Sequence, residues 1–250
     1  MTFDSNLYAK RRAQLAAQMA AQAPNSIAII PTAPERQRNR DSDFLFRHDS
    51  YFYYLIGFSE LHAWLVITSD GHSSLFCQPK DLEREIWDGI RLGPEAAPEV
   101  LGVEYAHSNQ ELDRKLGELL ADQDAVYIRL AESAEADRRL RHWMKQVRGQ
   151  ARSGVNPPSE FHDIEALIHE MRLFKDVHEI DIMRRAAAIS ARAHIRAMQI
   201  CKPGMREYQL EAELLHEFRN SGAQSVAYNS IVAGGANSCI LHYRAGSTEL

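Results

Sequence analysis

Residues 63–77, AWLVITSDGHSSLFC, contain the clearest structural signal in the sequence. Two apolar runs flank the pair Asp70-Gly71, and such a pair suits the positive φ angles of a tight turn. The stretch therefore predicts a β-hairpin. Strand-like and helix-like segments alternate around it, which is typical of an α/β layer structure with helices packed on a sheet. The predicted strands are 27–30, about 101–105 and 125–129, and the predicted helices are about 81–91, 109–120 and 133–147.

The character of the sequence changes after residue 150. Gly154, Asn156, Pro157 and Pro158 form the one concentrated cluster of residues that break helices and strands, and they predict a linker. The domains expected from this change are an N-terminal α/β domain at 1–158, a linker and leading helix at 159–175, and a second domain at 176–250.

The second domain is predicted to hold two helices and two strands. Asp176 and Glu179 match a capping box at the start of a long helix, and a second helix is expected at about 206–220. Strand-like segments follow at 225–233 and 239–243. Two helices and two strands make a thin core for an independent domain, so this domain looks unfinished. Its helices are therefore expected to leave apolar faces exposed.

Composition excludes several classes of protein. The 250 residues are 45% hydrophobic and 25% charged, the balance of an ordinary globular protein, and the net charge of −5 argues against a nucleic-acid partner. The longest uncharged apolar stretch, Tyr51 to Phe58, is far too short to cross a membrane. The N-terminus carries no secretion signal and the three cysteines form no CxxC pair, so a cytoplasmic location is expected.

Common catalytic motifs are missing, which leaves single candidate residues. The sequence has no HExxH, GxGxxG, P-loop or GxSxG pattern. His242 lies in the strand-like run ILHY, where a structural role is the more frequent one, although a neutral imidazole can donate an N–H to a developing oxyanion. Trp87 lies among charged residues at a helix end, so it is expected at or near the surface of a single copy. It fits a half-buried anchor about as well as an interface or ligand contact.

Several motifs, in order from about residue 6 to the last residues, resemble Xaa-Pro aminopeptidases (the aminopeptidase P family). The motifs of the N-terminal half are Arg40-Asp41-Ser42-Asp43-Phe44, Tyr54-Leu55-Ile56-Gly57-Phe58 and Ile86-Trp87-Asp88-Gly89. Those of the C-terminal half are His169-Glu170-Met171-Arg172-Leu173-Phe174-Lys175, Cys201-Lys202-Pro203-Gly204-Met205, Tyr228-Asn229-Ser230-Ile231-Val232 and Cys239-Ile240-Leu241-His242-Tyr243. Their number and order make the resemblance far more specific than any single motif.

The resemblance implies a fold and a function. The family combines an N-terminal α/β domain with an α+β "pita-bread" domain, here incomplete, which holds two metal ions, usually manganese. It releases the N-terminal residue of peptides whose second residue is proline. His242 matches the active-site histidine that contacts substrate and stabilises the tetrahedral intermediate. The resemblance also implies a homo-oligomer, dimer or tetramer, in which Trp87 and Arg152 reach the active site of a neighbouring subunit; Arg152 matches only by its position beside the linker.

One departure from the family pattern limits what the protein is expected to do. The family's metal ligands, two Asp, one His and two Glu, all follow the segment that matches 239–243, so no metal ligand is expected within 1–250. We therefore expect the N-terminal part of such an enzyme, as a truncated frame, an engineered fragment or a degenerate copy, with no activity alone. Two alternatives remain open: a non-catalytic binding or oligomerisation protein, and a relative of prolidase or creatinase that acts on a different C–N bond.

Overall fold

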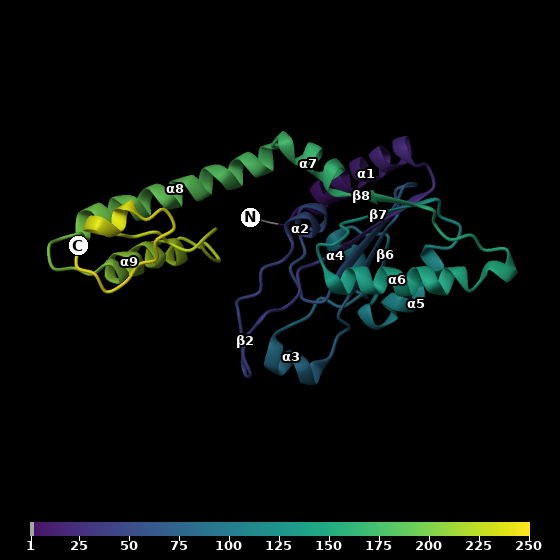
Figure 1. Ribbon diagram of the computed structural model, residues 1–250, viewed down its shortest axis with the longest axis horizontal. Helices are drawn as coiled ribbons and strands as arrows, with labels where there is room; N and C mark the ends of the chain where they lie inside the picture. Colours follow the sequence, from purple (N-terminus) through teal and green to yellow (C-terminus); the bar gives the residue numbers. More distant parts are fainter. Residues whose placement is uncertain (1–2) are drawn as a thin grey trace. The chain divides into compact units, whose positions relative to one another are not determined.

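The computed structural model describes residues 3–250, which form two units that divide after Leu173 (Figure 1). The first unit is built on a six-stranded mixed sheet in the order β6-β5-β4-β1-β7-β8. Its strands are β1 (Ser26–Pro31), β4 (Trp64–Thr68), β5 (Ser73–Cys77), β6 (Tyr105–Ser108), β7 (Ala125–Ile128) and β8 (Glu160–Asp163). β4 pairs antiparallel with both β1 and β5, whereas the β1–β7, β5–β6 and β7–β8 pairs are parallel.

The predicted hairpin at 63–77 is confirmed. β4 and β5 pair with Leu65 opposite Leu75, and the turn between them contains Gly71 at φ 99°. The N–H of Gly71 donates to the carbonyl of Thr68 at 2.9 Å, which closes the turn. The Asp-Gly pair therefore does what the pattern indicated, because glycine adopts a positive φ without steric cost.

The central strands are continuous apolar runs whose successive side chains point to opposite faces, so the sheet has a buried core on each face. Ala28 and Ile30 of β1 join one core cluster, while Ile27 and Ile29 join the other. The helices over the first face are α1 (Ser5–Gln22), α2 (Ser50–Ile56), α4 (Ala97–Leu101) and α7 (Glu165–Leu173). Those over the second face are α5 (Leu112–Leu119), preceded by the 3₁₀ turn η1 (Asn109–Glu111), and α6 (Ala134–Arg148) (Figure 1). This two-sided burial is the α/β layer structure expected from the sequence.

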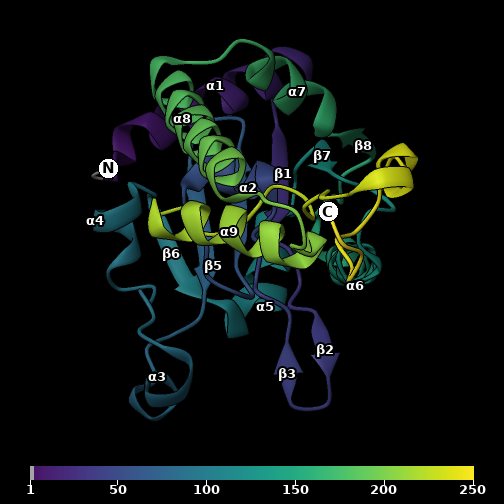
Figure 2. The same ribbon diagram turned by 90° about the vertical axis from the view of Figure 1, so that its left-hand side faces the viewer.

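Two segments project from the first unit (Figure 2). One is the short hairpin of β2 (Gln37–Asn39) and β3 (Ser42–Asp43), and the other is helix α3 (Leu82–Asp88), which has no buried residue. The aromatic-rich sequence near the hairpin divides accordingly: Phe44 is exposed, whereas Phe52 in α2 is fully buried.

The strand predicted near 101–105 is wrong in its position. Residues 97–101 form α4, with Pro98 in the first turn, where its missing N–H costs nothing. Gly102 ends this helix in the left-handed conformation at φ 64°, and the strand β6 begins only at Tyr105.

The sequence pattern favoured a division at Pro157-Pro158, whereas the two units divide after Leu173. Following the 3₁₀ turn η2 (Ala151–Ser153), β8 adds to the sheet beside β7, and α7 buries Leu167, Ile168 and Met171 in the first core. Residues 159–175 were expected to be a linker and leading helix, and residues 159–173 of that segment pack with the first unit.

The second unit, Phe174–Leu250, contains α8 (Val177–Ile200), α9 (Glu207–Asn220) and the 3₁₀ turn η3 (Gly235–Cys239). The predicted capping box is confirmed: the N–H of Glu179 donates to Asp176 at 2.8 Å, and the N–H of Asp176 donates to Glu179 at 3.0 Å. α8 and α9 pack together, and Arg196 of α8 binds Glu213 of α9.

The strands predicted at 225–233 and 239–243 are wrong. These residues form turns and η3, because a strand needs a partner and the one β-bridge of this unit within the described residues joins Arg206 to Glu249. As expected for this domain, its helices leave apolar side chains exposed; Met183, Ile195 and Met198 are examples.

No helix within residues 3–250 is long and apolar enough to span a bilayer.

Candidate functional site

Trp87 lies at the surface, as expected. It belongs to α3 and is 83% exposed, and three further apolar side chains of the same segment are about as open to solvent: Leu82, Ile86 and Ile90. Glu85 ties the residues on either side of α3 to the helix, since it pairs with Lys80 at 3.2 Å and accepts from the N–H of Arg91 at 3.2 Å. These four exposed apolar side chains, Leu82, Ile86 and Trp87 of α3 and Ile90 just beyond its end, are called the α3 patch.

Arg152 lies elsewhere in the first unit. It is the central residue of η2, shortly after the end of α6, and its side chain is exposed. Within residues 3–250 it makes no side-chain hydrogen bond and no ion pair, and nothing links it to Trp87. The first unit by itself therefore does not bring these two candidate residues together.

His242 lies in the second unit and is exposed. It was expected on a strand that shares a face with Ile240, but it occupies a turn that follows η3. In this turn the N–H of Ile240 donates to Asn237 at 3.0 Å and the N–H of Tyr243 donates to Ile240 at 3.3 Å. Its position therefore depends on what holds the turn and not on a strand ladder.

Glu207 holds that turn, and no pattern in the sequence singled it out. Glu207 is the first residue of α9 and is completely buried. One carboxylate oxygen accepts from the N–H of Gly234 at 2.9 Å and from Asn237 Nδ2 at 3.0 Å. The other accepts from the Tyr243 hydroxyl at 2.8 Å and from the N–H of Gly246 at 2.9 Å. Four donors from 27 to 39 residues further along the sequence thus meet on one carboxylate.

These donors also decide the charge of Glu207. Burial by itself would raise the pKa of the carboxyl group, but the hydrogen bonds from Asn237, Gly234, Gly246 and Tyr243 favour the charged form and lower its pKa to about 2. Position adds to this effect, because a carboxylate at the N-terminus of a helix interacts favourably with the helix dipole. For Glu207 the sequence indicated only that a helix begins soon after Lys202-Pro203-Gly204. A helix start explains an acidic residue at this position, but it does not predict the four donors that bind it.

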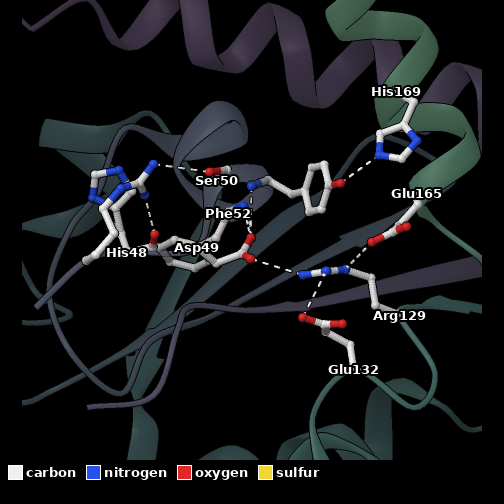
Figure 3. A network of polar contacts seen from close by, with 10 residues as sticks. His48, Asp49, Ser50, Phe52, Arg129, Glu132, Glu165 and His169 are labelled. Atoms are coloured by element: carbon white, nitrogen blue, oxygen red, sulfur yellow. Dashed lines mark hydrogen bonds and ion pairs between the residues drawn. The ribbon is translucent and has the colours of Figure 1, made fainter. Parts of the chain in front are cut away.

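A second polar network, shown in Figure 3, is centred on Arg129 in the first unit. Its guanidinium binds Asp49 at 3.1 Å, Glu132 at 3.3 Å and Glu165 at 2.6 Å, and it lies over the ring of Tyr51 at 4.7 Å. This arrangement joins the start of α2, the loop after β7 and the start of α7.

The same network includes the motif HEMRLFK at 169–175. His169 Nε2 and the Tyr51 hydroxyl are 2.6 Å apart (Figure 3). Arg172 lies over the rings of Tyr51 and Tyr54. Asp49 caps α2 by accepting from the N–H of Tyr51 at 2.8 Å. These contacts attach α7 to α2, so the side chains of the motif at 169–175 have a structural role and not a catalytic one.

The described residues do not fit a two-metal centre. Residues 3–250 contain no group of three or more His, Cys, Asp and Glu side chains that could hold a metal ion. Glu207 is the most enclosed carboxylate, but donors already occupy both of its oxygens. Two divalent ions held close together need several carboxylates that bridge or surround them.

Comparisons with known proteins agree over both units. Residues 8–127 match the family model described as "Aminopeptidase P, N-terminal domain", and residues 181–250 match "Metallopeptidase family M24". The Xaa-Pro aminopeptidase of Escherichia coli K12 is 44% identical over 247 residues, which cover 97% of this chain and 55% of the relative. The Xaa-Pro aminopeptidase of Haemophilus influenzae is 39% identical, with 94% and 52% covered.

The solved structures that match include Pseudomonas aeruginosa aminopeptidase PepP, with a TM-score of 0.95, 46% identity, and coverage of 99% of this chain and 56% of that one. Aminopeptidase P from Escherichia coli, in its low-pH form, has a TM-score of 0.95 at 43% identity, with 100% and 57% covered. The protein described here therefore spans about half the length of the curated relatives that it matches.

Proposed function

Because the chain belongs to the aminopeptidase P family, with its N-terminal domain and the first part of an M24 metallopeptidase domain, we propose that it is part of an enzyme that removes the N-terminal residue from peptides with proline second. The observation that carries this proposal is the agreement of sequence and fold across both units: 44% identity to a Xaa-Pro aminopeptidase over 97% of the chain. A shared fold alone would not support an activity, but identity at this level over the motifs of both units does.

In this proposal His242 is the catalytic residue that the chain contributes. A neutral imidazole carries one N–H, which can donate to the oxyanion that forms when water attacks the scissile carbonyl. The exposed position of His242 leaves its ring accessible to a bound peptide. Such a donor acts mainly in the transition state, so it affects kcat more than binding of the metal.

The metal is proposed to be a pair of manganese ions, held by residues outside the described part of the protein. Membership of a metallopeptidase family implies a divalent metal. Its chemistry, when bound, would be to activate water and to polarise the scissile carbonyl. A cytoplasmic location is proposed with it, because the three cysteines are unpaired.

The α3 patch is proposed as a contact between copies of the protein in a dimer or tetramer. Its four apolar side chains are each at least 79% exposed, although side chains of this size are usually buried. Trp is enriched at the centres of protein interfaces. Trp87, and Arg152 with it, would then contact the substrate bound by a neighbouring subunit.

The activity is tested by assaying hydrolysis of a Xaa-Pro peptide and measuring bound metal after dialysis. The 250-residue chain is expected to show neither turnover nor near-stoichiometric manganese, whereas a protein carrying this chain with a complete M24 domain is expected to show both. In the longer protein, His242→Ala should lower kcat by roughly 10²–10³-fold with metal content unchanged. Metal content that falls in proportion to activity would instead make His242 a ligand, and near-stoichiometric manganese with turnover in the 250-residue chain would contradict the proposal.

A further inference from the structure

Residues 234–250 fold back onto the start of α9, and Glu207 is the centre of this contact. In Figure 1 this segment, in yellow, runs beside α9. Its backbone is also tied to the helix start: the N–H of Glu207 donates to the carbonyl of Thr248 at 3.0 Å, and the N–H of Leu250 donates to Met205 at 2.7 Å. Glu207 is thus fixed in place by the segment that it holds.

The four donors to Glu207 lie on both sides of His242. Gly234 and Asn237 precede it in the sequence, and Tyr243 and Gly246 follow it. Asn237 Nδ2 also lies 2.9 Å from the Tyr243 hydroxyl, so the two ends of the turn are joined to each other as well as to the carboxylate. His242 is therefore the exposed tip of a turn whose two ends are attached to one buried group.

The close packing leaves little freedom for this turn. A Cβ atom at Gly246 would lie 3.1 Å from the Tyr243 hydroxyl and 3.5 Å from Glu207, and one at Gly234 would lie 3.2 Å from Leu250. Glycine at these two places lets the backbone N–H groups reach the carboxylate.

We propose that Glu207 is a positioning residue for His242, holding the turn 237–246 so that the imidazole meets the substrate in one orientation. This inference rests on the proposed function, because it gives the orientation of His242 a catalytic consequence. Glu207 itself is buried and does not contact the substrate, so its effect passes through the turn.

A carboxylate suits this role better than any other side chain. Two oxygens provide about four acceptor sites, which match the four donors, and bonds to a charged acceptor are roughly twice as strong as neutral ones. Glutamine has one acceptor oxygen, and its amide group would face N–H donors on the other side. Alanine would leave four buried donors without an acceptor.

The test is a double-mutant cycle between Glu207→Gln and His242→Ala in the protein with a complete M24 domain. Glu207→Gln alone is expected to lower kcat on a Xaa-Pro peptide by about 10- to 100-fold, because small displacements of a catalytic group have effects of this size. KM and bound metal per chain should change by less than about twofold. In the His242→Ala background the same substitution should lower kcat by less than about twofold, because a misplaced His242 is then no longer present.

Two further variants keep the test interpretable. Tyr243→Phe removes one donor without changing size, so it is expected to fold and to show a smaller loss of kcat, again only when His242 is present. Glu211→Gln, one turn further along α9, removes a carboxylate that makes no side-chain hydrogen bond or ion pair within residues 3–250, and it should leave kcat unchanged. Hydrogen exchange should be at least about tenfold faster at the amides of Gly234 and Gly246 in Glu207→Gln, and unchanged at Ala193 in α8.

Other outcomes would overturn either the positioning role of Glu207 or the catalytic role of His242. Equal losses of kcat from Glu207→Gln with and without His242 would show a merely structural role and overturn the inference. So would an unchanged kcat in Glu207→Gln and Tyr243→Phe when His242→Ala is impaired. If His242→Ala by itself leaves kcat unchanged, the catalytic role proposed for His242 is overturned, and the positioning role of Glu207 with it. The His242→Ala variant alone therefore separates a failure of the proposed function from a failure of this inference.

Discussion

Glu207 and Cys77 are both enclosed by protein, and their surroundings shift their pKa values in opposite directions. Burial raises the pKa of the Cys77 thiol to about 12, and the charges of Glu60 and Glu95 add to the effect. At Glu207, burial acts in the same upward direction, but the donors from Asn237, Gly234, Gly246 and Tyr243 outweigh it. What decides the charge of a buried group is therefore the set of donors that point at it.

The lowered pKa of Glu207 predicts how the second unit responds to acid. A carboxyl group whose pKa is below its ordinary value of 4.5 stabilises the folded state fully above that pH, and the contribution is lost as the pH falls through about 2. The difference in urea midpoint between the parent protein and Glu207→Gln should thus be largest above pH 4.5 and shrink below it.

Far-ultraviolet circular dichroism would follow the urea unfolding of both units. Tryptophan fluorescence, recorded on the same samples, would report the unfolding of the first unit. All three tryptophans, Trp64, Trp87 and Trp143, lie in the first unit, so their signal should not change between the two proteins. A midpoint difference that stays constant from neutral pH to pH 2 would contradict the pKa assigned to Glu207.

At the scale of elements, α7 was expected to lead into the second domain, but it packs in the core of the first unit. The motif at 169–175 resembles the start of a catalytic domain, yet its side chains attach α7 to α2. The backbone carbonyl of Met171 also accepts from the Tyr54 hydroxyl at 3.2 Å. The motif therefore fixes the last helix of the first unit, which α8 follows in the sequence.

Arg172→Ala is expected to lower the stability of the first unit by about 1–2 kcal/mol, through lost contacts of the guanidinium and its stem with Tyr51 and Tyr54. Urea unfolding followed by tryptophan fluorescence measures this unit alone, because the second unit has no tryptophan. Arg138→Ala is the matched control: its side chain is 71% exposed and its ion pair with Glu135 is 3.9 Å long, so a change below about 0.5 kcal/mol is expected. Equal effects of the two substitutions would show that the aromatic contacts of Arg172 contribute nothing specific.

At the scale of the whole molecule, the α3 patch is the feature that a single copy of the protein leaves unexplained. Its side chains belong to neither core cluster of the first unit. Helix α3 buries none of its own residues, and its N-terminus is capped locally by Asp81, which accepts from the N–H of Arg84 at 3.1 Å. Apolar side chains that no core of the same copy covers are what an interface between copies would need.

Trp87→Ser is expected to shift the protein toward smaller assemblies, because truncation of a central interface tryptophan commonly costs at least about 2 kcal/mol of association free energy. Sedimentation velocity over a range of concentrations measures this shift. Leu130→Ser provides the control, since Leu130 is also exposed, at 49%, but lies in the loop after β7. If both variants and the parent protein sediment alike, the α3 patch is not the contact between copies.

The sequence by itself determined the features that depend on neighbours a few residues away. The hairpin at 63–77 follows from two apolar runs on either side of Asp70-Gly71, and the start of α8 follows from the reciprocal bonds of Asp176 and Glu179. Trp87 at the surface was likewise predictable from its charged neighbours. Family resemblance added the two-domain organisation, because several motifs occur in one order.

Only the tertiary structure decided the features that depend on distant partners. Residues 225–233 and 239–243 have strand-like composition, but a strand exists only where another strand supplies hydrogen bonds. The role of the motif at 169–175 required the placement of Tyr51 and Tyr54, more than a hundred residues earlier. Glu207 is the extreme case: its four donors come from loops with no local pattern, and a buried charge becomes favourable only when folding brings all of them to it.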